Sequence, residues 1–349
     1  MEKKTHMSLM DRDYYWEDRD KKNKRQTNIM RIRKKSRVNK KAVFFFAFLI
    51  AFLAVIGYVD NYGIPQTVLN TLSSLGIDIS EADIKDLKSS YDGSYWEEDT
   101  YNEIYNGIVN YQTNISLSIP YTNQNSDIIS RQYKRVIDEH PELFWLDGSG
   151  KCAGTIMGNV ALMNIEIGTL CDINSVPQMK TLLDKAVTEI IFETNKRCKT
   201  DFEKAEFVHD VLIMNCEYDA ETYYRWMGMG DDRFNSAHTS YGCLVNRKAV
   251  CAGYAKAYML IMNELGIECG YVEGTAGTQG NFGPHAWNYI KLDDGYYMVD
   301  LTWDDPIGNS SGNIYHNYFC VNTETISKDH TIGDDQVIPL CEGVKYLNN

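Results

Sequence analysis

Apolar residues recur at helical spacing in several stretches of the chain. They occupy one face over residues 176–196 and again over residues 201–215, where we expect Asp201 to cap the helix. Residues 126–139 show the same spacing, with Ser126 as the expected cap. Each of these stretches is therefore predicted to bury one side of a helix and to expose the other.

The clearest helical stripe covers residues 251–265 and is followed by Gly266, which is well placed to end a helix. Cys251 then lies at the first position of this helix. The unpaired N–H groups and the positive end of the helix dipole at that position favour an anionic sulfur. A buried structural cysteine is the plainer interpretation of Cys251 taken alone, because cysteine packs as a small apolar residue.

Other runs predict strands. Residues 143–146 are expected to form a short buried strand, and residues 155–168 to be extended. Three further strands are predicted over residues 268–275, 285–292 and 296–303. The last two are close enough in sequence to form an antiparallel hairpin.

The register of that hairpin decides which acid meets His285. A two-residue turn at Asp294-Gly295 places His285 opposite Asp304. Asp300 shares the same sheet face but lies four residues, ~13 Å, further along the strand. A longer loop or a bulge must shift the register if Asp300 contacts His285. Spacing alone leaves both Asp300 and Asp304 open.

Charge divides the chain into two unequal parts. Of the 349 residues, positions 1–41 hold 15 Lys/Arg and 6 Asp/Glu, and the remainder holds 20 basic and 42 acidic residues. Such an acidic main part argues against nucleic acid as a partner.

His209 lies on a predicted helix, where a histidine is more often structural than catalytic.

The basic head leads into an uncharged, apolar segment over residues 42–59, long enough to span a bilayer. Residues 21–41 carry 11 Lys/Arg and no acid, which predicts a cytoplasmic N-terminus. We expect a single-pass protein of the cell membrane that contacts lipid through residues 42–59, with its C-terminal part extracellular. A cleaved secretion signal is the rival interpretation, but the positive region is too long for one.

Four parts are therefore expected. They are a basic cytoplasmic tail (1–41), a transmembrane anchor (42–59), a stalk and helical region (60–151) and a globular domain (152–349). Nine cysteines lie beyond the anchor, so an oxidising exterior would permit up to four disulfides and one free thiol. No Cys-x-x-Cys pair occurs, which gives a cysteine-based zinc site little support.

The segments around the thiol resemble the transglutaminase-like (papain-fold) superfamily. The matching segments are Tyr241-Gly242-Cys243-Leu244-Val245, Ala249-Val250-Cys251-Ala252-Gly253-Tyr254-Ala255, Gly266-Ile267-Glu268-Cys269, His285-Ala286-Trp287-Asn288 and Tyr296-Tyr297-Met298-Val299-Asp300-Leu301-Thr302-Trp303-Asp304-Asp305-Pro306. More narrowly, the chain resembles the bacterial branch akin to cytokinesis-linked transglutaminase/protease-like proteins. That branch carries segments like His140-Pro141-Glu142-Leu143-Phe144-Trp145, His209-Asp210-Val211-Leu212 and Tyr315-His316-Asn317-Tyr318-Phe319.

The resemblance implies an α+β fold in which an antiparallel sheet packs on a helix that carries the cysteine at its N-terminus, preceded here by one transmembrane helix. It implies a catalytic triad of Cys251, His285 and Asp300, and so selects Asp300 over Asp304. It also suggests Tyr241 or a nearby residue as part of an oxyanion pocket. Nothing resembles the calcium loops of the animal enzymes, so we expect no metal and no cofactor.

The expected activity is that of a cysteine hydrolase or acyltransferase acting on amide bonds of surface proteins or cell-wall peptides. The first alternative is a catalytically silent papain-like domain that binds cell-wall or division components. The second is a disulfide-rich adhesin, which would require Cys251 itself to be bridged.

Overall fold

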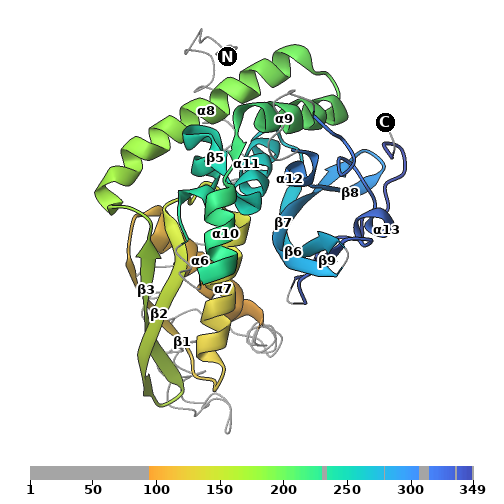
Figure 1. Ribbon diagram of the computed structural model, residues 1–349. Helices are drawn as coiled ribbons and strands as arrows, with labels where there is room; N and C mark the ends of the chain where they lie inside the picture. Colours follow the sequence, from red (N-terminus) through yellow and green to blue (C-terminus); the bar gives the residue numbers. More distant parts are fainter. Residues whose placement is uncertain (1–93, 230–233, 279, 306–313, 335, 348–349) are drawn as a thin grey trace, which may run out of the picture. The chain divides into compact units, whose positions relative to one another are not determined.

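The computed structural model describes residues 94–229, 234–278, 280–305, 314–334 and 336–347 (Figure 1). The predicted basic tail, the predicted anchor over residues 42–59 and the start of the predicted stalk lie outside these ranges. Within the ranges, no helix combines the length and the apolar character needed to cross a membrane.

The described residues mix helices and strands. The α-helices are α6 (Ser94–Val109), α7 (Asn125–Glu139), α8 (Val176–Arg197), α9 (Asp201–Asn215), α10 (Ala220–Met229), α11 (Cys251–Glu264), α12 (Leu301–Asp304) and α13 (Thr323–Ile326). Two 3₁₀ turns and one π-helical turn are η1 (Ile173–Ser175), η2 (Ser236–His238) and η3 (Gly242–Asn246). The strands are β1 (Asn114–Pro120), β2 (Leu146–Met157), β3 (Val160–Thr169), β4 (Glu217–Tyr218), β5 (Lys248–Ala249), β6 (Cys269–Thr278), β7 (Asn281–Leu292), β8 (Gly295–Val299) and β9 (His330–Ile332).

The helices predicted over residues 176–196, 201–215 and 251–265 are confirmed as α8, α9 and α11. Two predicted caps are wrong. Thr200 caps α9 in place of Asp201, because its hydroxyl accepts from the Glu203 amide while Glu203 reaches back to the Thr200 amide. Helix α7 begins one residue before Ser126, and no side chain caps it.

The strand predicted over residues 143–146 is wrong except at Leu146, which begins β2, although the burial of the segment was expected correctly. These residues form tight turns, in which the Leu143 amide donates to His140 O and the Leu146 amide to Leu143 O. Their apolar side chains are buried because Phe144 stacks on Tyr241, with ring centroids 4.8 Å apart. The extended run over residues 155–168 is confirmed, but it folds as a hairpin of β2 and β3.

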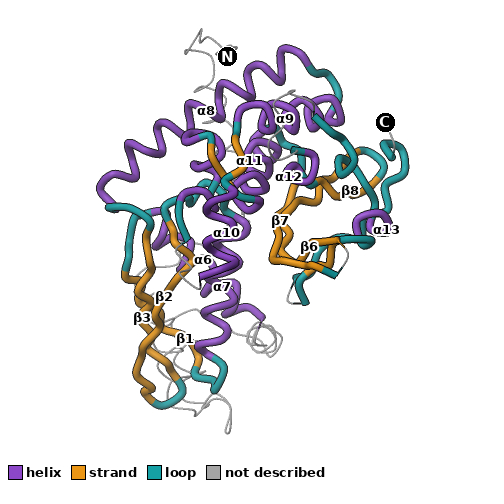
Figure 2. The backbone as a smooth tube through the Cα atoms, in the orientation of Figure 1, coloured by secondary structure: helices purple, strands orange, loops and turns teal. Residues whose placement is uncertain are grey.

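Two antiparallel sheets contain most of the strands (Figure 2). Strands β1, β3 and β2 form one sheet in that order, and α7 contacts β2. The other sheet has the order β8-β7-β6-β9, and α11 packs on its strands β6 and β7. Helices α8 and α9 also contact α11, so this helix is buried between helices and sheet.

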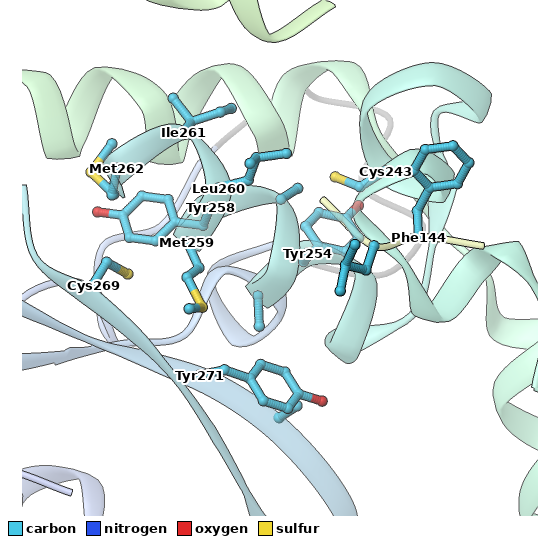
Figure 3. Packing of buried hydrophobic residues seen from close by; sticks show 14 of the residues in the cluster. Phe144, Cys243, Tyr254, Tyr258, Met259, Leu260, Ile261, Met262, Cys269 and Tyr271 are labelled. Carbon is cyan, nitrogen blue, oxygen red and sulfur yellow. The ribbon is translucent and has the colours of Figure 1, made fainter. Parts of the chain in front are cut away.

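Helix α11 is buried almost all round, which explains its dense apolar sequence. Figure 3 shows Tyr258 and Met262 on the side of Cys269, with Tyr254 lying toward Cys243. The Tyr258 hydroxyl donates to Ala205 O of α9 at 3.3 Å. The Cys-bearing end of the helix is thus fixed by a large, specific core.

The predicted hairpin turn at Asp294-Gly295 is one residue out. Leu292 pairs with Gly295, so Asp293 and Asp294 form the turn, and Gly295 already belongs to β8. The strand predicted to continue to residue 303 ends at Val299. The chain then leaves the sheet to form α12. Asp300 therefore lies outside the strand, and the hairpin register does not fix its position.

All nine cysteines, each within the described residues, are free thiols. The disulfides permitted by an oxidising exterior are therefore absent from the structure, and Cys251 is not bridged. The domain boundaries stay predictions, and strand β2 runs across the one placed between residues 151 and 152.

Candidate active site

Cys251 is the first residue of α11, as predicted. Val250 precedes it in an extended conformation and provides no side-chain cap. The first amides of a helix lack partners within the helix, so those of Cys251 and Ala252 can donate to a charged group near the sulfur. The thiol is buried but lines a cavity, which leaves it open to a ligand.

His285 and Asp300 are in direct contact. Nε2 of the imidazole lies 2.6 Å from Oδ2 of the carboxylate, and both side chains are buried. Asp300 also caps α12, because its Oδ1 accepts from the amides of Thr302 and Trp303. The two carboxylate oxygens thus differ in role, since Oδ1 fixes the backbone and Oδ2 holds the imidazole.

A second histidine reaches the same oxygen. Nε2 of His330 lies 3.0 Å from Oδ2 of Asp300, and Nδ1 of His330 lies 2.6 Å from Oδ1 of Asp329. Tyr318 donates to the other oxygen of Asp329 at 2.6 Å. A continuous polar chain therefore runs from Tyr318 through His330 to His285.

The sheet brings the two histidines together. His285 on β7 pairs with Gly274 on β6, and His330 on β9 pairs with Ala276 of the same strand. Side chains two positions apart on a strand share a face, so both imidazoles lie on one face of the sheet. A Cβ atom on Gly274 would come within 2.0 Å of Thr331 O, so only glycine fits there.

Two indole rings enclose the histidines. Trp287 packs edge-on to His330 with ring centroids 5.0 Å apart, and Trp303 lies 4.5 Å from His330 and 6.1 Å from His285. Apolar walls keep water from the polar contacts and strengthen them. His285, Asp300 and His330 thus form a rigid, largely desolvated group.

Charge within this group shifts both partners of the close pair. Burial lowers the pKa of His285, but the charges of Asp300 and Cys251 and the hydrogen bond to Asp300 outweigh burial and raise the pKa to about 10. Burial acts to raise the pKa of Asp300, yet the two histidines hold it well below its usual range. The protonated imidazole and the ionised carboxylate are the favoured forms.

Cys251 and His285 line the same cavity of about 800 Å³. Since Nε2 of His285 faces Asp300, Nδ1 is the nitrogen left to face the thiol. The charge of Cys251 also contributes to the raised pKa of His285. The structure therefore brings all three predicted site residues, Cys251, His285 and Asp300, into one cluster.

Asp304, the rival by spacing, lies elsewhere. Its Oδ2 is 3.3 Å from Nε2 of His209, and both side chains are fully buried. The Tyr318 amide also donates to Asp304. Because Asp304 belongs to α12 and His209 to α9, their contact links the two helices. The other ring nitrogen of His209 contacts Asp210, so His209 has a structural role.

Tyr241 does not line the cavity but stacks on Phe144. The expectation that Tyr241 or a nearby residue forms part of an oxyanion pocket stays a prediction. Tyr223 does line the cavity, and burial together with the nearby Cys251 raises the pKa of its hydroxyl. Tyr223, on α10, is a residue of the site that the sequence did not reveal.

Two groups of side chains could hold a metal ion, as judged over the described residues. One is His285, Asp300 and His330, and the other is His209, Asp210 and His316. In both groups the nitrogen–oxygen distances of 2.6–3.0 Å are those of hydrogen bonds between the side chains. Hydrogen bonding alone accounts for these arrangements.

A helix-borne thiol, a histidine on an antiparallel sheet and an aspartate just beyond the end of a neighbouring strand are typical of a papain-like architecture. Residues 188–301 match the family model of the transglutaminase-like superfamily. The chain contains a transglutaminase-like domain with the papain-like transglutaminase fold. The resemblance to the bacterial cytokinesis-linked branch stays a prediction.

Two curated proteins and one solved structure are similar to parts of the chain. Kyphoscoliosis peptidase from Homo sapiens is 25% identical over 165 residues, which cover 43% of this chain and 23% of that protein. The same peptidase from Mus musculus is 23% identical over 166 residues, covering 44% and 23%. The chain thus spans about a quarter of the length of these relatives. The crystal structure of a TGase matches with a TM-score of 0.32 at 13% identity, over 58% of this chain and 52% of that one.

Proposed function

We propose that this protein is a thiol enzyme that acts on amide bonds through Cys251, His285 and Asp300. The observation that carries the proposal is the 2.6 Å contact between His285 and Asp300 beside a cavity that His285 and Cys251 both line. The transglutaminase-like fold usually carries cysteine protease or acyltransferase activity, which supports the proposal.

In the proposed reaction, the Cys251 proton resides on Nδ1 of His285, leaving a thiolate beside an imidazolium. Asp300 stabilises the imidazolium and fixes its orientation through Nε2. The thiolate attacks the substrate's amide carbon, and its electron pair forms the carbon–sulfur bond while the carbonyl oxygen becomes anionic. The amides at the start of α11 are placed to donate hydrogen bonds to that oxyanion.

Collapse of this intermediate breaks the carbon–nitrogen bond. His285 protonates the leaving amine, and the acyl group remains on sulfur as a thioester. A second nucleophile then attacks the thioester after His285 removes its proton. The carbon–sulfur bond then breaks, and its electron pair restores the Cys251 thiolate beside the imidazolium. Water gives hydrolysis and a free acid, whereas an amine gives transamidation and a new amide.

The proposed substrates are surface proteins or cell-wall peptides. This choice depends on the membrane anchor predicted over residues 42–59 and on the extracellular placement predicted for the domain. The name of the human and mouse relatives, a peptidase, agrees with hydrolysis of peptide bonds as one outcome.

The test is to trap the thioester. The full chain, purified in detergent, is incubated with extracts of surface protein and wall peptides and then quenched with acid. We expect an added mass on the peptide containing Cys251 that hydroxylamine removes, because hydroxylamine cleaves thioesters. Methylamine present during turnover would distinguish transamidation, which yields an N-methylamide, from hydrolysis.

Two matched variants complete the experiment. Cys251→Ala must lose the added mass, and His285→Gln must form it far more slowly. An adduct on another cysteine, or none in the wild type with any extract, would contradict the proposal and favour a silent binding domain.

A further inference from the structure

The cavity at Cys251 has a mixed, charged lining. It is bounded by parts of α7, β2, α11, β6 and β7. Three cations and three carboxylates line it: Lys134, Lys151, Lys256, Asp138, Asp147 and Glu273. The large acidic excess of residues 42–349 is therefore not reproduced inside the cavity.

Lys256 differs from the other cations of the cavity. It follows Ala252 by one helical turn on α11, and both residues line the cavity. The residue is buried, with a relative exposure of 7%. Over the described residues, Lys256 has neither an ion pair within 4.0 Å nor a hydrogen bond. An unpaired ammonium is an expensive group to bury.

The acids near Lys256 are engaged by another lysine. Nζ of Lys134 lies 2.8 Å from Asp138 and 2.6 Å from Glu273. The second carboxylate oxygen of Glu273 accepts from the Tyr271 hydroxyl at 3.0 Å. Asp138 and Glu273 therefore support Lys256 only from a distance.

Aromatic faces complete the surroundings of the ammonium. Nζ of Lys256 lies 5.1 Å from the ring centroid of Tyr271 and 5.8 Å from that of Phe234. Such contacts compensate only part of the lost hydration. Burial lowers the pKa of Lys256, so the folded protein keeps this cation at a cost that a bound anion would offset.

We propose that Lys256 is the receptor for a carboxylate on the substrate, so that the enzyme prefers peptides with an acidic side chain near the reacting amide. The carboxylate would accept from the ammonium, while the apolar faces of Tyr271 and Phe234 contact the side-chain stem. Lys256 would thus set specificity, not chemistry. This inference rests on the proposed function, because it concerns the substrate that reaches Cys251.

A matched pair of thiol reagents tests the inference directly. Bromoacetyl-Glu-amide and bromoacetyl-Gln-amide have the same reactive carbon and differ only in carboxylate against amide. The corresponding Asp and Asn reagents provide a shorter pair. Alkylation of Cys251 is followed by mass spectrometry on the full chain in detergent. In the wild type we expect the acidic reagent to react about tenfold faster than its amide partner, as a charge-assisted hydrogen bond would produce.

Lys256→Met keeps the volume and removes the charge, and it should bring the ratio of the acidic to the amide rate close to one, with the amide rate of the same variant as the reference. Lys256→Arg should retain most of the preference. A wild-type rate ratio near one for both pairs, or a ratio that Lys256→Met leaves intact, overturns the inference. Failure of Cys251 to react with any of the four reagents would instead contradict the proposed function. A cooperative thermal unfolding transition shows that Lys256→Met is folded.

Discussion

Nε2 of His330 lies 3.0 Å from Oδ2 of Asp300, the same oxygen that contacts His285. The orienting carboxylate is therefore shared between two imidazoles. The other ring nitrogen of His330 lies 2.6 Å from Oδ1 of Asp329, so His330 links the two carboxylates. We regard His330 as a positioning residue that fixes the Asp300 carboxylate and reduces the extent to which that carboxylate raises the pKa of His285.

His330→Gln tests this role. We expect alkylation of Cys251 by iodoacetamide near neutral pH to slow about tenfold, because Asp300 loses one of its charge-assisted contacts. With less competition for Asp300, the pKa of His285 should rise, so the alkaline limit of the alkylation rate should move to higher pH. Loss of thermal stability with an unmoved pH profile would show that His330 is structural only.

Asp300 can be dissected by two substitutions, because its two oxygens have different partners. Asn caps helices as well as Asp does, so Asp300→Asn should keep α12 in place while removing the charge from His285. Asp300→Ala removes both functions and should cost about 1 kcal/mol more in the free energy of unfolding. Urea denaturation measures the difference, and equal stabilities would refute the separate capping role.

The raised pKa of His285 predicts a definite pH dependence. The folded value is about 10, whereas an unfolded histidine titrates near 6.5. His285 therefore binds its proton more tightly in the folded state than in the unfolded state. This contribution to stability is fully present below about pH 6.5 and is lost as the pH rises through about 10.

Wild type and His285→Gln should accordingly converge in free energy of unfolding across that interval. The rate of Cys251 alkylation should show an alkaline change near pH 10 in the wild type. In Asp300→Asn this change should move toward lower pH, because the carboxylate that stabilises the imidazolium is gone. An unmoved alkaline change would contradict the assigned cause of the shift.

The pair of His209 and Asp304 should affect stability, not reactivity. Asp304→Ala leaves a buried His209 without its carboxylate, which typically costs about 3–5 kcal/mol. Asp210→Ala provides a milder control, because Asp210 is partly exposed. Equilibrium denaturation should rank the two variants in that order. A large fall in the Cys251 alkylation rate of a still-folded Asp304→Ala protein would restore Asp304 as a candidate for the site.

The sequence predicted the Cys-bearing helix well, because the apolar stripe of α11 is long and Gly266 ends it with a positive φ of 79°. The partner of His285 could not be derived from spacing. The turn uses Asp293 and Asp294, and β8 ends at Val299. The apolar pattern of the sequence does not predict that strand end. The family resemblance selected Asp300 where geometry alone could not.

Other features were hidden or overlooked. His330 lies on the short edge strand β9, which carries too few residues for a pattern. Lys256 lies within an apolar helix whose burial on every side removes the usual contrast between faces. Strand β1, by contrast, alternates buried and exposed residues, so its period of two was available to the sequence and was missed.

The central claim is that the start of α11 and the imidazole of His285 together make the Cys251 sulfur reactive. The most direct measurement is the rate of iodoacetamide labelling of each of the nine cysteines near neutral pH, resolved by mass spectrometry. Cys251 should react far faster than the other eight and lose that lead in His285→Ala. Labelling of Cys251 no faster than the other buried thiols, or a rate unaffected by His285→Ala, would contradict the account.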